Sequence, residues 1–325
     1  MKKILLSILA FCGLAAAKAQ NEIMTAVLHH GSDMSVFTGA NAFVNANAAA
    51  ADGDVIMLSS GSFNVSNITK SITIYGAGFE KDDANGVEVT KFNSQLNIGV
   101  SGGDTLKDIR LEGIYFNSTV NAQAALKGFV LEKCYVNGNI NLIENTNTTI
   151  VNCVVNSDIN GNNKTAANCI IQNCHVKGTI NTFEAGSSVK IDHCITSSWV
   201  GPYTCTNSIF AQFGRYGEAA FANTQGAIVK NCIFRDNNSN NASNNDFQNC
   251  YTVNITEIFA DAELATYSAT RTFEIKQPTT WIGTDGQEIG IRYGWSKTPK
   301  TPAVKNLTTT VSGESLNVNY DAMTR

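Results

Sequence analysis

The chain has 325 residues, with 27 acidic and 23 basic side chains, and only 15% of its residues are charged while 43% are hydrophobic. So few charges among so many apolar residues exclude a disordered chain and indicate one or two globular units. The net charge of −4 excludes a strongly basic protein, so nucleic acid is not an expected partner. The 38 asparagines predict many bends in the left-handed backbone region, which asparagine enters more easily than most residues.

Residues 1–19 have the pattern of a secretory signal peptide. Lys2 and Lys3 precede an apolar run from Ile4 to Ala17, and Ala17-Lys18-Ala19 matches a cleavage site. Cleavage removes three lysines and no acid, which leaves 20 basic and 27 acidic groups and a net charge of −7. No later segment has 18 uninterrupted apolar residues. We therefore expect an exported protein without a transmembrane segment, located in the periplasm, at the cell surface or outside the cell.

The start of the mature chain is expected to form a helical cap. The Ala-rich stretch from Gly39 to Ala51 predicts a helix that ends at Asp52-Gly53-Asp54. Val55–Leu58 follows as an apolar strand, a turn is expected over Ser60–Phe63, and Ile72–Gly76 begins a series of coils. The predicted parts of the chain are the signal peptide (1–19), an N-terminal cap (20–54), a parallel β-helix (55–298) and a C-terminal appendage of strands (299–325).

A repeat of about 20 residues runs through the middle of the chain. Cys134, Cys153, Cys174 and Cys194 are separated by 19, 21 and 20 residues, and equivalent positions extend this column in both directions. The residue just before each anchor is Gly or Asn in six of eight repeats, and these two residues adopt a left-handed bend most easily. The residues of this bend column are Gly113, Lys133, Asn152, Asn173, His193, Asn207, Asn231 and Asn249.

A second column has the same period. Val120, Ile140, Ile159 and Ile180 are 20, 19 and 21 residues apart, and each is followed by Asn. Polar residues on both sides of each apolar one give the two-residue period of a β-strand. Short strands and bends in a repeat of this length predict a parallel β-solenoid, in which each coil bonds to its neighbours at a spacing of about 4.8 Å.

The bend column resembles the asparagine ladder of the right-handed parallel β-helix in the pectate-lyase-like superfamily, from which Lys133 and His193 depart. The segment Asp285–Ile291, followed by Tyr293-Gly294, resembles a closing segment of exported β-helix proteins from Bacteroidetes-type bacteria. The resemblance covers roughly residues 55–290 and implies an all-β, right-handed parallel β-helix with an N-terminal helical cap. It implies little about activity, because this fold is shared by lyases, hydrolases, esterases, adhesins and inert spikes.

The cysteine column allows two interpretations. Stacked coils bring cysteines within disulfide range, but parallel side chains do not suit the geometry of the bridge. We therefore expect reduced thiols that pack as small buried groups. A metal site is not expected, because no CxxC occurs and Cys169, Cys174 and His175 have a poor zinc spacing.

The end of the chain predicts a short appendage. Pro299 and Pro302 mark a linker, and apolar and polar residues alternate over 303–322. This pattern predicts two strands with a turn at Gly313. Two strands are too few for an independent domain, so we expect them to pair with an edge or to pack on the solenoid.

Two constellations on the coils could carry chemistry. The polar residues beside the second column include one acid, Asp158, and no base. Lyases of this superfamily hold Ca²⁺ with clustered carboxylates and use an Arg or Lys base, so this row fits sugar binding or a solvated sheet face better than a lyase site. Glu144 and Glu184 lie two coils apart, at about 9.6 Å, which is the far edge of the separation in inverting glycosidases. Asn163 is expected between them.

The repeat becomes irregular between Ser197 and Gly226, and an Asn/Ser-rich loop, Asn237–Asn245, follows. Aromatic rings there could stack on a sugar and arginines could hold a carboxylate. The same side chains could instead cover the outward-facing Ile195, Ile209 and Ile233. The candidate substrate-binding residues are Trp199, Tyr203, Arg215, Tyr216, Arg235 and Asp236.

The sequence thus predicts an exported β-helix protein that binds, and in the extended form of the hypothesis processes, an extracellular polysaccharide. An enzyme of this kind would be a polysaccharide lyase or a glycoside hydrolase, and only a lyase would need Ca²⁺. No catalytic residue is identified, and no metal or other cofactor is expected. The alternative is a non-catalytic surface, adhesion or structural solenoid, which the sparse acids on the expected catalytic face favour.

Overall fold

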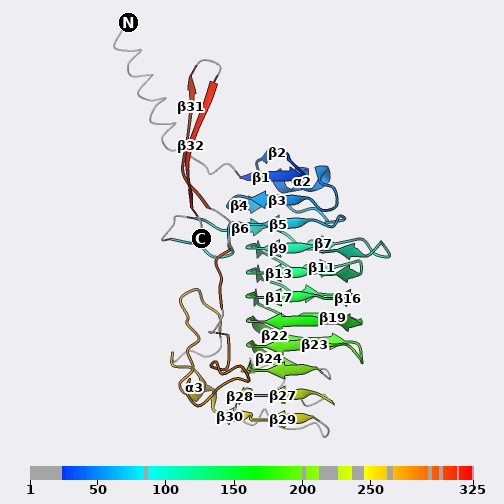
Figure 1. Cartoon of the computed structure of the whole chain (residues 1–325), viewed down its shortest axis with the longest axis vertical. Helices are drawn as coiled ribbons and strands as arrows, with labels where there is room; N and C mark the ends of the chain where they lie inside the picture. Colours follow the sequence, from blue (N-terminus) through cyan, green and yellow to red (C-terminus); the bar gives the residue numbers. More distant parts are fainter. Residues whose placement is uncertain are drawn as a thin grey trace.

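The computed structural model describes residues 24–83, 87–199, 203–211, 226–235, 245–261, 266–291, 295–299, 303–312 and 315–323. These residues form a right-handed parallel β-solenoid of about eight turns, whose coils stack along the long axis of the molecule (Figure 1). The predicted all-β fold is confirmed, with 44% of residues in strands and 5% in helices. The predicted signal peptide lies outside the described residues.

Three sheets, here called A, B and C, form the walls. Sheet A contains β2 (Asp33–Thr38), β1 (Thr25–His30), β3 (Val55–Leu58), β5 (Thr73–Tyr75), β9 (Arg110–Glu112), β13 (Val130–Glu132), β17 (Thr149–Val151), β21 (Cys169–Gln172), β23 (Val189–Asp192), β25 (Thr204–Thr206), β27 (Ile228–Lys230) and β29 (Asp246–Gln248). The long arm of sheet B contains β4 (Gly61–Phe63), β6 (Thr90–Phe92), β10 (Tyr115–Phe116), β14 (Tyr135–Val136), β18 (Val154–Val155), β22 (His175–Phe183), β24 (Ile195–Trp199), β26 (Ile209–Phe210), β28 (Ile233–Arg235) and β30 (Tyr251–Val253). The short arm of sheet B contains β7 (Leu96–Ile98), β11 (Val120–Ala122), β15 (Ile140–Asn141) and β19 (Ile159–Lys164), and it joins the long arm at β22. Sheet C contains β8 (Leu106–Lys107), β12 (Leu126–Lys127), β16 (Asn145–Thr146) and β20 (Ala166–Ala167).

Each coil turns from sheet A to sheet B at the predicted bend column. All eight residues of this column have a positive φ, from +47° at Asn173 to +72° at Gly113. Lys133 and His193 follow the same geometry, with φ of +50° and +49°. The left-handed region costs an ordinary residue about 1–2 kcal/mol. The stacking of the coils therefore imposes the bend even where the residue is neither Gly nor Asn.

A second left-handed bend, which the sequence analysis missed, leads from sheet C back to sheet A. It is formed by Asp108, Gly128, Asn147 and Asn168, with φ of +51°, +73°, +55° and +55°. Neighbouring members bond directly, since Asn168 Nδ2 donates to Asn147 Oδ1 at 3.1 Å. Two such corners per coil give these coils a closed cross-section.

The interior is filled by the apolar columns that the repeat predicted. Leu131 of sheet A, Val136 of the long arm of sheet B and Ile140 of its short arm lie in one coil and are all 0% exposed. Burying one such side chain contributes about 1.5–3 kcal/mol relative to leaving it in water. Because each coil repeats the set, the core is continuous along the axis.

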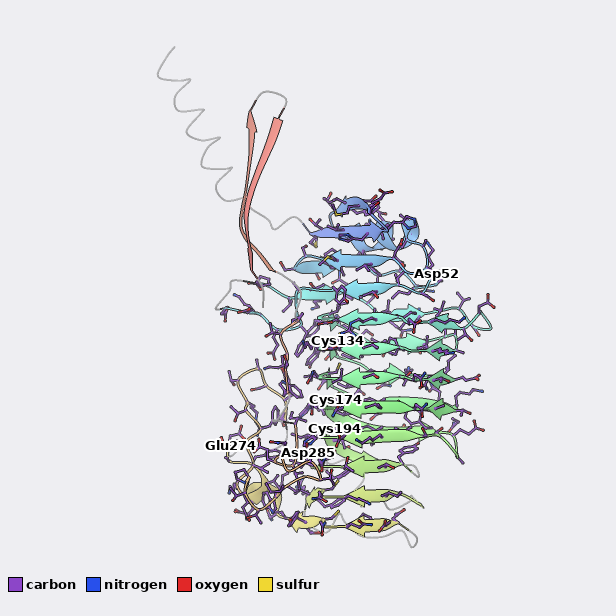
Figure 2. All side chains as sticks on the ribbon, viewed as in Figure 1. Asp52, Cys134, Cys174, Cys194, Glu274 and Asp285 are labelled. Atoms are coloured by element: carbon purple, nitrogen blue, oxygen red, sulfur yellow. The ribbon has the colours of Figure 1, made fainter. Side chains whose placement is uncertain are left out.

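The cysteine column lies inside this core. Figure 2 shows Cys134, Cys174 and Cys194 one above another along the stack. All eight described cysteines are free thiols, and seven are buried. The Sγ of Cys174 donates to Ile150 O of the preceding coil at 3.5 Å. Burial raises the pKa of the Cys169 thiol to about 12. The predicted packing role of reduced thiols is confirmed.

The N-terminal end is closed by helix α2 (Ala42–Ala49), as the Ala-rich stretch predicted. The sequence analysis missed the hairpin before it, in which β1 pairs antiparallel with both β2 and β3. The turn expected over Ser60–Phe63 is wrong in part, because Gly61–Phe63 is strand β4 and pairs with β6. A Cβ at Gly61 would lie 2.4 Å from the Met24 side chain, so a small residue is required at this strand.

The chain after β30 returns along the outside of sheet B. Helix α3 (Ile255–Ile258) and residues 266–291 contribute to a second apolar cluster, which contains Ile195, Ile209 and Ile233. The described cover of these three isoleucines therefore comes from the C-terminal segment. The final strands, β31 (Ala303–Ser312) and β32 (Ser315–Met323), pair antiparallel with each other as a separate sheet (Figure 1). The two strands were predicted correctly, but the alternative in which they pair with an edge of the solenoid is wrong, while the alternative in which they pack on the solenoid stays a prediction.

We predict that the thiols stay reduced and unreactive in the folded protein. A thiol reagent such as Ellman's reagent should label at most the half-buried Cys250 quickly, because burial suppresses the thiolates that react. All eight thiols of the chain from residue 20 onward should react after unfolding without reductant. A count below eight under those conditions would reveal a disulfide and contradict this expectation.

Candidate functional site

A continuous row of asparagines lies on the outer surface of the short arm of sheet B. It begins at Asn67, before β7, and ends on β22, and it is here called the amide face. The backbone register aligns these residues from coil to coil. Asn121, Asn141 and Asn160 each donate from Nδ2 to the Oδ1 of the preceding member, at 3.1, 3.3 and 3.1 Å. The amide face consists of Asn67, Asn97, Asn121, Asn141, Asn160 and Asn181.

A second polar row lies on the other side of the inward apolar column. Asp158 N donates to Asn139 Oδ1 at 3.2 Å, and Asp158 Oδ1 accepts from Thr179 N at 2.7 Å and from Thr179 Oγ1 at 3.1 Å. The one carboxylate of this row is thus held by hydrogen bonds within the protein. The row consists of Thr119, Asn139, Asp158 and Thr179.

The amide face can bind a polyhydroxyl ligand without any charge. Each side-chain amide has two N–H donors and an oxygen with two lone pairs. The ladder uses one donor and one lone pair of an inner member such as Asn141, which is half-buried. The remaining donor and lone pair of Asn141 suit the hydroxyl groups of sugars, which both donate and accept.

The structure brings no metal site together in the parts of the chain it describes, where no group of three His, Cys, Asp or Glu side chains could hold an ion. Glu144 and Glu184 are both exposed, at the turn between sheets B and C. The residue between them is Thr165, not Asn163 as expected, because Asn145 pairs with Ala166. The hydroxyl of Thr165 donates to Glu184 at 2.6 Å. Thr165 thus lies on the wall between the two carboxylates and engages one of them.

The predicted substrate-binding residues are only partly described. Arg215, Tyr216 and Asp236 lie outside the described residues, and Trp199 ends β24 without a described side chain. Arg235 ends β28 and is half-buried. Their expected role in binding stays a prediction.

Tyr203 lies in the interior. Its side chain is 2% exposed and packs edge-on against Phe183, with ring centroids 5.7 Å apart. The hydroxyl accepts from Phe183 N at 3.2 Å, and burial raises its pKa to about 12. The ring has no free face for a sugar, so in this conformation Tyr203 belongs to the core. The broken repeat spacing around residue 203 hid this inward position from the sequence analysis.

A buried charge network, which the sequence analysis missed, lies on sheet A. Arg110 pairs with Glu112 at 2.9 Å and also with Glu132 of the next coil. Lys133 is 2% exposed, and its Nζ lies 3.8 Å from Glu112 and 3.6 Å from Glu132. Burial opposes the charge on Arg110, but the two glutamates outweigh it and raise its pKa. The signal in the sequence was that Glu112 and Glu132 are one repeat apart and therefore stack in adjacent coils. Two stacked carboxylates need cations nearby.

The network predicts that removing one cation destabilises the protein. Lys133→Met should lower the free energy of unfolding by about 3 kcal/mol, because Glu112 and Glu132 lose a buried partner. Adding Glu132→Gln should recover part of that loss, since it removes one of the two stacked charges. Urea unfolding measures both effects, and equal stability of wild type and Lys133→Met would contradict the account.

The bend column is bound from outside by the C-terminal strap, defined as residues 281–291 and 295–299. Asn231 Nδ2 donates to Ile282 O at 2.7 Å, and Asn207 Oδ1 accepts from Thr284 N at 2.7 Å. These bonds tie two successive coils to one turn of the strap. The amides of the bend column therefore bond to the strap, and that of Asn207 also bonds to Asp192 of the preceding coil.

The strap continues along the stack toward the N-terminal end. Ser296 N donates to Asn152 Oδ1 at 3.3 Å. A Cβ at Gly113 would come within 2.6 Å of Pro299, so glycine is needed there for space as well as for its φ of +72°. Figure 1 shows this segment as the orange trace that runs beside the coils toward β31 and β32.

Substitutions at Asn207 separate two contributions of a bend-column residue to stability: its hydrogen bonds and its tolerance of the left-handed backbone. Asn207→Ala should lower the free energy of unfolding by about 3 kcal/mol, because it loses buried hydrogen bonds and strains the bend. Asn207→Gly loses the same bonds without the strain, so its loss should be about 1 kcal/mol smaller. Chemical denaturation of both variants measures this difference, and an alanine variant as stable as the glycine variant would refute the strain term.

Comparison with known proteins adds no assignment. No protein family, no curated protein and no solved structure matches the chain. Within the described residues, no helix is long and apolar enough to cross a membrane.

Proposed function

We propose that this chain is an exported β-helix protein of the pectate-lyase-like type that binds an extracellular polysaccharide along its amide face. The observation that supports the proposal is the row of half-exposed asparagines aligned from β7 to β22, whose amides bond in series from Asn97 to Asn160. Export rests on the signal-peptide pattern of residues 1–19.

The chemistry of the face favours a neutral, extended glycan. Among the two rows described above, Asp158 is the one charged residue, and its Oδ1 accepts from Thr179. An acidic sugar would find no cation in these rows, whereas hydroxyl groups would find amide donors and acceptors. The coils repeat at about 4.8 Å, which is the scale of one sugar in an extended chain.

The proposal is binding rather than cleavage. Cleavage by hydrolysis needs two carboxyl groups facing each other across the sugar. Glu144 and Glu184 are separated by Thr165, which donates to Glu184 at 2.6 Å. Processing of the glycan is thus the part of the hypothesis that this face supports least, and a lyase reaction with Ca²⁺ has no carboxylate cluster here to support it.

The test is a glycan array with the mature chain, followed by affinity measurement on the glycans that bind. We predict that neutral, linear polysaccharides bind, with or without Ca²⁺. The triple variant Asn121→Thr/Asn141→Thr/Asn160→Thr should weaken binding at least about tenfold, because three amides that each contribute about 0.5–1.5 kcal/mol are lost. Threonine suits an exposed strand position, so the fold should be retained.

The matched control is Gln172→Thr/Gln248→Thr, which removes two amides from the outer surface of sheet A. It should bind like the wild type. Binding that the triple variant keeps in full would contradict the amide face as the site. Release of unsaturated or reducing sugars would show an enzyme, and no binding across a broad panel would leave the adhesive or structural alternative.

A further inference from the structure

His193 belongs to the bend column, and both nitrogens of its ring contact the strap. Its Nδ1 lies 2.9 Å from Gly290 O, and its Nε2 lies 3.0 Å from Asp285 Oδ2. The ring is 4% exposed, so water does not replace these partners. Figure 2 shows Asp285 beside the coil that carries Cys194, the residue that follows His193.

Both partners of the ring are acceptors. A backbone carbonyl can only accept, and so can an ionised carboxylate. Burial alone would raise the pKa of Asp285, but the bonds from Gln287 N and from His193 lower it below its ordinary value. The carboxylate is therefore ionised. Both bonds can form together only when both ring nitrogens donate, which is the doubly protonated, positively charged form of His193.

The other charged groups on the elements packed here have their own contacts or lie further along the strap. Asp192 Oδ1 accepts from Thr206 Oγ1 at 2.6 Å and from Asn207 Nδ2 at 3.0 Å, and Asp192 Oδ2 pairs with Lys190 at 3.2 Å. The remaining charged residues are Lys230 on β27 and, on the described part of the strap, Glu288 and Lys297, of which Lys297 pairs with Glu80 at 2.7 Å. Asp285 is thus the carboxylate that bonds directly to the ring.

We propose that His193 is a pH-operated latch, which holds the C-terminal strap on the solenoid while the ring is protonated and loosens it when the ring loses a proton. A neutral ring has a single N–H, so one of its two bonds is lost. The bonds are formed at the point where Ile289 and Ile291, both 1% exposed, enter the apolar cluster with Ile209. Loosening the latch therefore weakens the cover of the outer face of sheet B.

The direction of the pH effect follows from this protonation state. Because only the charged ring makes both bonds, strap attachment and proton binding favour each other. One of the two bonds is lost when the ring becomes neutral, so attachment weakens as the pH rises. At the acidic end of the pH range the bond depends on Asp285, whose lowered pKa keeps the carboxylate ionised until strongly acidic pH.

The experiment is hydrogen exchange of the mature chain, read by mass spectrometry at pH 5.5 and 8.5. The exchange of residues 281–291 is divided by that of residues 130–136, which removes the intrinsic effect of pH on exchange. The latch predicts that this ratio rises by about threefold or more at pH 8.5, because deprotonation shifts the opening equilibrium. An unchanged ratio in the wild type would overturn it.

Two variants locate the effect. His193→Asn places in the column the residue that Asn152, Asn173 and Asn207 already supply, so the bend should form, but nothing titrates there. Its ratio should be the same at both pH values. His30→Asn removes a separate His–Asp pair, formed with Asp54 at 2.8 Å, and should leave the rise intact. A rise that persists in His193→Asn would refute the latch.

A second measurement does not depend on any variant. Nitrogen-15 NMR of labelled histidine should show both ring nitrogens of His193 protonated at pH 5.5, and one of them deprotonated where the exchange ratio rises. A neutral ring at pH 5.5, or deprotonation without any change in strap exchange, would overturn the proposal.

Discussion

The fixed spacing between stacked coils is the constraint on which the rest of this structure depends. Each coil must lie about 4.8 Å above the last so that its backbone groups find partners there. Every coil then has to turn at the same corners. Two columns of left-handed residues meet that requirement, one before sheet B and one before sheet A. The solenoid is stabilised by the apolar columns between these corners.

The same constraint decides which side chains can be repeated. Stacked amides bond to one another, so asparagine can recur on the amide face and in the bend before sheet A. Stacked carboxylates repel, and the one such pair described on sheet A, Glu112 and Glu132, is accompanied by Arg110 and by the buried Lys133. His193 follows the same logic, because its charge is matched by Asp285 on the strap. The two charged residues of the bend column, Lys133 and His193, thus mark places where charge is balanced.

Much of the fold could be predicted from local pattern, because the coils repeat in sequence as they do in space. The bend column was predicted at all eight positions, including Lys133 and His193. Asp108, Gly128, Asn147 and Asn168 have the same spacing, but no conspicuous residue such as cysteine drew attention to them. The path of the strap could not be predicted, since Asp285 reaches His193 across 92 residues with no repeat between them.

The candidate site was less predictable than the fold for a related reason. The asparagines that follow Val120, Ile140 and Ile159 were recognised as an outward row, but their bonding into one amide face depends on the register between coils. Tyr203 was assigned to binding because the repeat breaks near it, whereas burial places it in the core. A solenoid predicts regular positions well and irregular positions poorly.

The central claim is that a neutral glycan lies along the amide face. The most direct test is hydrogen-exchange footprinting of the wild-type chain with and without a neutral polysaccharide that it binds. The account predicts slower exchange in the segments that contain β11, β15 and β19, and no change in sheet A. Protection confined to sheet A or to residues 226–235, with none at β11, β15 and β19, would contradict it.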